Sequence, residues 1–378
     1  MLGVCIVSLA LIVVLSVFNG FEDVVIKMYN SFNPDLEIKI NKGKTFDESV
    51  IDNIKNVEGV AWITKVVEEN ALLEYKGRQH IATIKGVSPE FSKTSTIDTA
   101  IIEGDFILEK DNRNYAVAGQ GIAYFLDIRL SDFIEPLKVY VPKRDINFSL
   151  SPDKAFNNAS IFPSGIFSVQ QEFDTKYLIV PLQFARKIMD YSSEVTSLEI
   201  ALHKNVDKKK VQQEIQKILG NDFSVKDRFQ QQALLYKIMK TEKWAIFLIL
   251  TFILIIATTG IIGSLIMLIV DKKDDIAVLM SMGTPIKIIK RVFITEGLMI
   301  VGIGALTGII LGTLLCLLQM KYGFVKLGTT GTFVIDAYPV KIKIIDFIFS
   351  IFTILLIGFI SICIPVSRIS PKYIDKQL

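Results

Sequence analysis

The chain has 378 residues, of which 51% are hydrophobic, and its mean hydropathy is +0.44. This composition is too apolar for an ordinary soluble protein, and a formal net charge of +3 does not indicate nucleic-acid binding. Cys5, Cys316 and Cys363 all fall within apolar runs. The polar middle, residues 22–243, therefore has no cysteine for a disulfide, a cysteine metal site or a thiol nucleophile.

The first segment, Leu2–Phe18, is uncharged and predicts a transmembrane helix, although it is short for a full span. A signal peptide is the alternative, but no Lys or Arg precedes the run and no small-residue cleavage site follows it. The helix is expected to continue as an amphipathic stalk until Asn33-Pro34 ends it. The apolar positions of this first stalk are Phe18, Phe21, Val25, Met28 and Phe32.

The polar middle has the patterns of an α+β domain. Strands are predicted at Leu36–Ile40, Ala61–Val67, Ala71–Tyr75, His80–Val87, Leu137–Val141, Tyr177–Val180, Val195–Leu202 and Phe223–Lys226. Helices are predicted at Asp47–Asn56, Gly121–Leu126, Leu182–Tyr191 and Lys208–Leu219. Gly77 marks a hairpin, and Ser149–Gly165 is the most loop-like stretch because it is rich in Pro, Asn and Ser.

A second stalk leads from this domain into a second span. Trp244–Val270 contains no charged residue and is long enough to cross about 30 Å of hydrocarbon as a helix. The apolar positions of the second stalk are Phe229, Leu234, Leu235, Ile238 and Met239. An ordinary packed helix pair would give the same pattern as two stalks.

A short charged segment with an amphipathic helix follows the second span. The run ends at Asp271-Lys272-Lys273-Asp274-Asp275, and Pro285 interrupts helical periodicity further on. Between them, one helix face carries Ile276, Leu279, Met280 and Gly283 at i, i+3, i+4 and i+7. This apolar face predicts a docking surface for a partner, with a simple cytoplasmic turn as the alternative.

A third span runs to Leu318 and a fourth covers residues 344–366. Gly304, Gly308 and Gly312 lie four apart on the third span and predict close helix packing, either within the chain or in a dimer. The basic 272–291 segment and the tail are expected to be cytoplasmic, which places the large domain outside. The tail cations are Arg368, Lys372 and Lys376, and Lys321, Lys326, Lys341 and Lys343 oppose this contrast.

No pattern for catalysis or cofactor binding is found. Gly43-Lys44-Thr45 lacks the glycine that a phosphate loop needs five residues earlier, where Ile38 stands. His80 and His203 have no metal-ligand spacing, and no nucleophile elbow or zinc-protease motif occurs. No enzyme, cofactor or metal site is therefore expected in this chain; if ATP drives this protein, the ATPase that binds ATP and Mg is another chain.

Several segments resemble the lipoprotein-releasing (Lol-type) permeases of ABC transporters, within the wider FtsX-like and MacB-like (type VII) superfamily. The similar segments are Leu15-Ser-Val-Phe-Asn-Gly20-Phe21-Glu22, Asp271-Lys272, Asp275-Ile276-Ala277-Val278-Leu279, Met282-Gly283, Glu296-Gly297 and Asp336-Ala-Tyr-Pro339-Val340. The resemblance implies a permease subunit that extracts lipoproteins from the inner membrane and hands them to a periplasmic carrier. It also implies a charged cytoplasmic segment before the first span, which this sequence lacks; a truncated start would account for that.

The resemblance implies four partners: an ABC ATPase dimer, a second permease copy or paralogue, lipoprotein substrates and the carrier, with no nucleic acid. ATPase coupling is expected at Asp275, Ile276, Ala277, Leu279, Met280, Met282 and Gly283. A lipid cavity is expected between the first two spans at Val14, Val17, Phe18, Phe21, Trp244, Phe247 and Leu248. Carrier docking is expected at Phe156, Ile161 and Phe162, which could instead hold their loop to its own domain.

The predicted fold is an α-helical membrane protein with four transmembrane helices and an α+β periplasmic domain inserted between helices 1 and 2. It is expected in the bacterial inner membrane. The segments are 1–32 (first helix and stalk), 33–225 (periplasmic domain), 226–270 (stalk and second helix), 271–291 (coupling helix), 292–320 (third helix), 321–343 (periplasmic loop), 344–366 (fourth helix) and 367–378 (cytoplasmic tail). The alternatives are a mechanotransmitting permease that signals without moving substrate, and a drug or peptide exporter.

Overall fold

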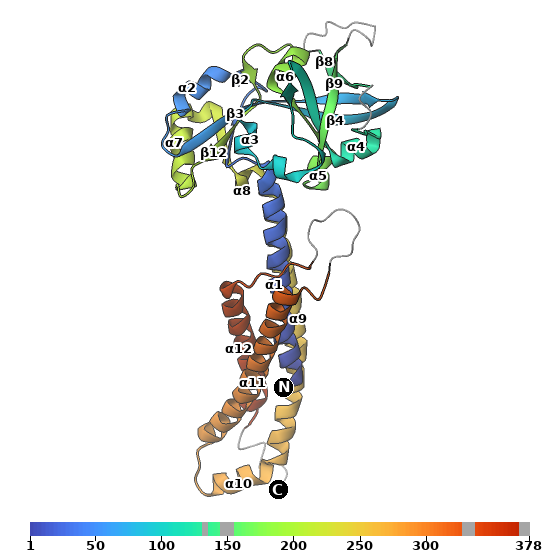
Figure 1. Ribbon diagram of the computed structural model, residues 1–378. Helices are drawn as coiled ribbons and strands as arrows, with labels where there is room; N and C mark the ends of the chain where they lie inside the picture. The colour runs from blue at the N-terminus through green and yellow to red at the C-terminus, as the bar shows by residue number, and fades with distance from the viewer. Residues whose placement is uncertain (131–134, 144–154, 327–336, 370–378) are drawn as a thin grey trace. The chain divides into compact units, whose positions relative to one another are not determined.

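The computed structural model describes residues 1–130, 135–143, 155–326 and 337–369 (Figure 1). The chain divides into two compact units. The first, the helical unit, comprises Met1–Val25 and Leu235–Leu378. The second, the sheet unit, comprises Ile26–Leu234.

The helical unit is built from long apolar helices. Four helices have the length and composition to cross a membrane, with candidate spans Leu2–Ile26, Ala233–Asp271, Ile286–Tyr322 and Ile344–Ser367 among the described residues. They belong to α1 (Leu2–Phe32), α9 (Ala233–Asp271), α11 (Ile286–Tyr322) and α12 (Ile344–Ser367), and the short α10 (Lys273–Ser281) joins α9 to α11. The four apolar runs that the sequence predicts as spans are all helical.

Glycines set the close approach of α11 to α1. A Cβ added at Gly308 would lie 2.3 Å from the carbonyl oxygen of Cys5, which is far inside contact distance. Added Cβ atoms at Gly304 and Gly312 would lie 3.1 Å from the carbonyl oxygens of Met1 and Leu9, respectively. The groove that these three glycines form therefore receives α1 of the same chain.

One mixed sheet dominates the sheet unit. Among the described residues, eleven strands join it in the order β13-β1-β12-β3-β4-β10-β7-β9-β5, with β6 beside β7 and β8 beside β3 and β9. The strands are β1 (Leu36–Ile40), β3 (Val60–Tyr75), β4 (Arg78–Val87), β5 (Ile101–Gly104), β6 (Glu109–Lys110), β7 (Arg113–Gly119), β8 (Leu137–Pro142), β9 (Phe156–Phe167), β10 (Tyr177–Pro181), β12 (Ser197–Leu202) and β13 (Phe223–Asp227). A separate pair consists of β2 (Phe46–Asp47) and β11 (Glu194–Val195).

The two faces of the central strands differ in chemistry because side chains alternate along a strand. One face carries buried apolar side chains such as Ile38, Ile84 and Ile200, which form the core of the unit. Short helices accompany the sheet (Figure 1): α2 (Ile51–Ile54), α3 (Phe91–Thr94), α4 (Gln120–Leu126), α5 (Gln171–Asp174), α6 (Leu182–Met189), α7 (Lys208–Leu219) and α8 (Arg228–Gln231). The alternate positions form a polar face, whose members include Glu37, Thr64, Glu68, Lys85 and Glu199.

Several predicted elements are confirmed. The strand Leu36–Ile40 and the helix Lys208–Leu219 have the predicted bounds, and Lys76 and Gly77 form the hairpin turn with φ of 47° and 77°. The strands β12 and β13 that flank α7 are both antiparallel to β1, which lies between them. Strand β12, helix α7 and strand β13 thus form a β-α-β unit whose two parallel strands are separated by β1.

Two sequence-based predictions are wrong, and a third is confirmed in part. The predicted strands Ala61–Val67 and Ala71–Tyr75 are one strand, because Glu68, Glu69 and Asn70 pair with β4 without a break. Within the predicted helix Asp47–Asn56, a 3-10 turn at Glu48–Val50 leads directly into α2, so the helix forms but is shorter than predicted. The predicted loop Ser149–Gly165 is strand β9 from Phe156 onward, because β8 and β7 supply its hydrogen-bonding partners, and residues 149–154 lie outside the described residues.

Candidate functional site

The predicted coupling residues lie on and after α10, in two environments. Ile276 is buried in the core of the helical unit, and Ala277 and Met280 pack partly against it. Leu279 is 45% exposed and Met282 is 77% exposed. The remaining residues of the predicted set, Asp275 and Gly283, are also exposed.

Local interactions determine where α10 begins and ends. Asp275 in its first turn accepts a hydrogen bond from Lys272 at 3.0 Å, and acidic residues are favourable at a helix N-terminus. Gly283 then adopts φ of 91°, which turns the chain toward Pro285 and α11. We call the exposed apolar side chains Val278, Leu279 and Met282 the α10 patch. Leu279 and Met282 belong to the predicted coupling set and Val278 does not, and the three exposed side chains together form a surface that suits contact with another protein.

A polar junction that sequence reasoning missed connects three helices of the helical unit. The buried side chain of Asn19 on α1 donates to Asp346 on α12 at 2.6 Å. Lys243 on α9 donates to both, at 2.8 Å to Asn19 and 2.9 Å to Asp346. A buried carboxylate between apolar helices is stable only with such partners.

Two further ion pairs join α1 to the chain just before α12. Lys341 pairs with Asp23, and Lys343 pairs with Glu22 at 2.7 Å. The close approach of Gly20 to the Pro339 carbonyl, where an added Cβ would lie 2.3 Å away, permits this arrangement. The unexpected lysines after the third span were the sequence signal for these contacts.

The predicted lipid-cavity residues differ in exposure. Val14, Phe21, Trp244 and Leu248 are exposed, Val17, Phe18 and Phe247 are half-buried, and the Trp244 and Phe247 rings lie 5.9 Å apart. A cavity of about 470 Å³ lies between α1 and α11, and of the predicted residues it includes Val17. Helices α1 and α9, which carry the predicted residues, also pack together, since a Cβ added at Gly3 would lie 3.5 Å from the Ala257 Cβ. The lipid cavity between the first two spans stays a prediction.

Aromatic side chains fix the end of α1 within the sheet unit. The Phe32 ring stacks on Phe173 at 4.5 Å and lies 4.9 Å from the Tyr177 ring. One turn earlier, the Tyr29 hydroxyl donates to Glu172 at 2.7 Å, and burial together with this hydrogen bond raises the pKa of Tyr29 to about 12. The last turn of α1 is therefore anchored by both stacking and a charge-assisted hydrogen bond.

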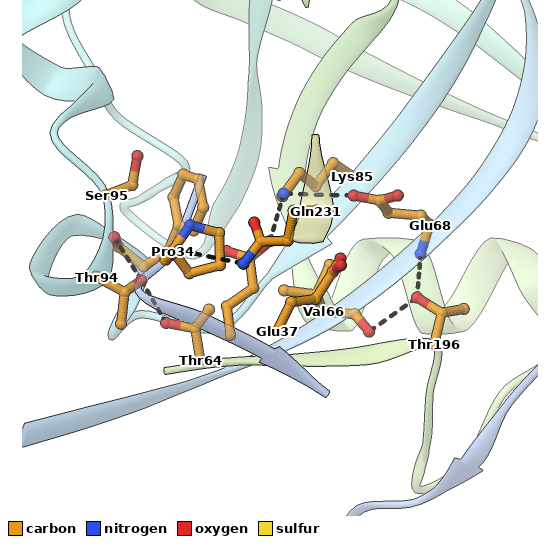
Figure 2. Close-up of polar contacts among 12 residues, drawn as sticks. Pro34, Glu37, Thr64, Val66, Glu68, Lys85, Thr94, Ser95, Thr196 and Gln231 are labelled. Carbon is orange, nitrogen blue, oxygen red and sulfur yellow. Dashed lines mark hydrogen bonds and ion pairs between the residues drawn. The ribbon is translucent and has the colours of Figure 1, made fainter. Parts of the chain in front are cut away.

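Buried charges lie beside this anchor on the polar face of the sheet. Lys85 is 3% exposed and donates to Glu199, itself 2% exposed, at 2.5 Å. The same ammonium lies 3.3 Å from Glu68 on the neighbouring strand (Figure 2). It also lies 4.7 Å from the centre of the Phe32 ring. Lys85 thus links three elements: α1, β3 and β12.

Electrostatics explains why this cluster holds together. Burial alone would lower the pKa of Lys85, but the Glu199 and Glu68 carboxylates raise it overall, so the lysine stays charged. Burial raises the pKa of Glu199, and the Lys85 ammonium offsets this only in part. The second carboxylate oxygen of Glu199 has no hydrogen-bond partner among the described residues.

Hydrogen bonds also connect α8 to the chain that directly follows α1. Gln231 donates to the Pro34 carbonyl at 3.3 Å (Figure 2), and Arg228 donates to it at 3.3 Å. Lys208 adds a 2.5 Å ion pair to Asp35. The chain leaving α1 and the chain entering α9 are therefore fixed close together within the sheet unit.

The predicted carrier-docking residues lie on β9 and face two ways. Phe156 and Phe162 are exposed, whereas Ile161 is buried in the core. The alternative that these residues hold their segment to its own domain therefore applies to Ile161. An exposed pair of aromatic rings on a strand remains available to a partner.

The side chain of His80 makes ordinary packing and hydrogen-bonding contacts. His80 shares a 2.9 Å hydrogen bond with the Thr175 carbonyl and stacks on Phe125 at 5.0 Å. Within the described ranges, no group of three or more His, Cys, Asp or Glu side chains could hold a metal ion.

Two protein-family models match this chain, one at each end. Residues 1–139 match the MacB-like periplasmic core domain, and residues 247–374 match the FtsX-like permease C-terminal family. The extracellular domain of the ABC-type transporter YknZ from Gram-positive bacteria aligns with 51% of this chain and 99% of that structure at 12% identity, with a TM-score of 0.38. That score is too low to assign a shared fold.

The relatives extend over almost the whole chain. The lipoprotein-releasing system transmembrane protein LolE of Haemophilus influenzae is 24% identical over 97% of this chain and 90% of that protein. LolC of Buchnera aphidicola subsp. Schizaphis graminum is 26% identical over 97% of this chain and 88% of that protein. The chain therefore carries a MacB-like periplasmic core domain and an FtsX-like permease C-terminal domain, and its resemblance to the Lol-type ABC transporter permeases is confirmed.

Proposed function

We propose that this permease extracts lipoproteins from the inner membrane and hands them to a periplasmic carrier, driven by a separate ABC ATPase. The observation that carries the proposal is the similarity to LolE and LolC over 97% of the chain. In this proposal the sheet unit is the periplasmic domain, inserted between the first and second spans. The functional unit contains an ATPase dimer, which binds ATP and Mg, and a second permease copy or paralogue.

The energetic task is to move acyl chains out of the bilayer. Each methylene that leaves hydrocarbon costs about 0.8 kcal/mol unless it is buried again. In our proposal ATPase closure moves α10, and the connected α9 and α11 pass this motion to the lipid-facing surfaces of α1 and α9. The anchored end of α1, at Phe32, supports transmission of force to the sheet unit.

Reconstitution tests this function. The chain, its candidate ATPase and its partner permease would be placed in proteoliposomes with an acylated lipoprotein, and release to a soluble carrier would be measured with ATP. We expect ATP-dependent release. Photocrosslinkers at Val14 and Phe21 should capture the acylated protein. ATP turnover without release or capture would favour the mechanotransmitting permease, and resistance to small toxic compounds would favour an exporter.

Coupling should depend on the α10 patch. Leu279→Glu is expected to abolish release while ATPase subunits still hydrolyse ATP, since a charge buried at a contact without a partner costs several kcal/mol. Ser281→Glu adds the same charge at a polar, exposed position of the same helix and should leave release nearly unchanged. Full release by Leu279→Glu would show that the patch does not couple the ATPase.

Carrier docking should depend on the exposed rings of β9. Replacing Phe156 and Phe162 with Ser is expected to weaken carrier binding about tenfold or more, as expected for loss of aromatic anchors at an interface. Carrier pull-down by the purified complex measures this, and ATP turnover should not change. Ile81→Ser is the control, because Ile81 is 73% exposed on β4. Equal binding by wild type and the double variant would place the docking surface elsewhere.

A further inference from the structure

An apolar cavity in the helical unit has walls from α1 and α11. Val13 and Val17 line it on α1, and Leu315 and Cys316 line it on α11. Its volume of about 470 Å³ lies within the range of about 300–1,000 Å³ that small-molecule ligands occupy. A single acyl chain is a ligand of this size and polarity.

Hydrogen bonds build the roof of this cavity from the chain on either side of residues 327–336. The Gln319 amide donates to the Val325 carbonyl at 3.0 Å and to the Tyr338 carbonyl at 3.2 Å. Its oxygen accepts from the Val325 N–H at 3.0 Å, and Tyr338 N–H donates to Val325 at 2.8 Å. Because Gln319 has its partners within the wall, the cavity is left with an apolar interior.

The roof lies at the depth expected for a membrane interface. The apolar run of α11 ends at Met320 and is followed by Lys321 and Tyr322. The Tyr322 and Phe324 rings lie 5.5 Å apart, and aromatic side chains of this kind gather where hydrocarbon meets headgroups. A chain in the cavity would therefore carry its headgroup at the level of the roof.

The charges at that level favour an anionic headgroup. Of the four lysines at the end of α11 and in the chain from there to α12, Lys341 and Lys343 are neutralised by Asp23 and Glu22. Lys321 and Lys326 are exposed, and no carboxylate among the described residues forms an ion pair with either. Two cations without a carboxylate partner among the described residues therefore lie beside the roof. Lys321 is two residues after Gln319, and Lys326 follows Val325 directly.

We propose that this cavity binds one acyl chain of an anionic phospholipid, whose headgroup contacts Lys321 and Lys326. The lipid is a resident of the permease and not its cargo, so the proposal does not depend on lipoprotein release. It also accounts for two lysines that the positive-inside pattern leaves unexplained.

The test uses the full chain, without its ATPase, in lipid vesicles. Phe324→Trp places an indole at the roof after Trp62 and Trp244 are changed to Phe. Phosphatidylglycerol or phosphatidylcholine brominated on the acyl chains then serves as the quencher at equal mole fraction. We expect phosphatidylglycerol to be preferred about tenfold or more, since each lysine near an anionic lipid contributes about fivefold. Tyr338→Trp, in the opposite part of the roof, repeats the measurement if the first reporter disturbs folding.

Two variants make the test specific. Lys321→Gln with Lys326→Gln should abolish the preference, whereas Lys290→Gln with Arg291→Gln, at the other end of α11, should keep it. Val17→Phe should fill the cavity and reduce quenching, whereas Val292→Phe, at an exposed position, should not. Equal quenching by both lipids would mean nonspecific lipid contact, and absence of quenching would mean that a second copy covers the cavity. Either result overturns the proposal.

Discussion

Replacing Lys85 with Met should destabilise the protein by about 3–5 kcal/mol, because Glu199 and Glu68 would lose the cation that compensates their burial. The ammonium also contacts the Phe32 ring, so the end of α1 should loosen at the same time. Denaturant unfolding of the purified full chain, followed by the fluorescence of Trp62 in the sheet unit, measures the loss. Hydrogen exchange at the end of α1 should rise with it.

The chain offers a matched control for that substitution. Lys44 pairs with Glu69 at 2.6 Å, but its side chain is 59% exposed. Lys44→Met should therefore cost less than about 1 kcal/mol. Adding Glu199→Leu to Lys85→Met should recover much of the loss, since an apolar pair can replace a buried ion pair. Equal losses for Lys85→Met and Lys44→Met would mean that the buried cluster contributes no more than a surface pair.

Gly308→Leu should prevent correct assembly of the helical unit. Even a Cβ at this position would lie 2.3 Å from the Cys5 carbonyl and 2.7 Å from the Ser8 Cβ, so α1 and α11 would have to separate. Overpacking commonly costs about 1–3 kcal/mol, and a clash with backbone lies at the upper end. We expect the yield of folded protein in membranes to fall at least roughly fivefold, measured by size-exclusion chromatography of detergent extracts.

Gly302→Leu tests whether that effect is specific to the groove. Gly302 lies on the same helix, and an added Cβ there would meet nothing within 4 Å. The yield of folded Gly302→Leu protein should stay close to that of the wild type, because the new side chain would point away from α1. Wild-type yield from Gly308→Leu would contradict the packing that the glycine spacing and the structure both indicate.

The transmembrane helices could be predicted from sequence because the signal for each is local. An uncharged run of sufficient length, such as Trp244–Val270, leaves few alternatives to a membrane helix. The same holds for α10, whose charged start and Gly283 end lie within a dozen residues. Element boundaries at Leu36–Ile40 and Lys208–Leu219 were set by turn residues next to them.

The strand β9 could not be predicted because its stability comes from distant partners. Its sequence, Phe156–Phe167, contains Asn, Ser, Pro and Gly, which favour turns in isolation. Residues 156–161 of its backbone pair with β8, and the residues that follow pair with β7 on one edge and with β5 on the opposite edge. Neighbours that far apart in the chain supply the hydrogen bonds that local propensity opposes.

The contact between the buried charges could not be predicted from the sequence either. Lys85 and Glu199 are 114 residues apart, and each follows an alternation that looks like an ordinary half-exposed strand. Only the sheet order, which puts β3 between their strands, brings them into contact. The cavity between α1 and α11 was missed for a similar reason, because the sequence does not specify that α11 is a neighbour of Val17.

The junction of Asn19, Lys243 and Asp346 has a consequence for biogenesis. Helices α1 and α9 are synthesised long before α12. In the nascent protein, Lys243 therefore lacks its carboxylate partner, Asp346, until α12 has been made. The triad closes only if α12 inserts with its N-terminal end, which carries Asp346, on the same side as Asn19. An inverted last helix would leave both a cation and an acid unmatched near hydrocarbon. Complete pairing of these three side chains therefore requires the final span to have one orientation relative to the earlier ones.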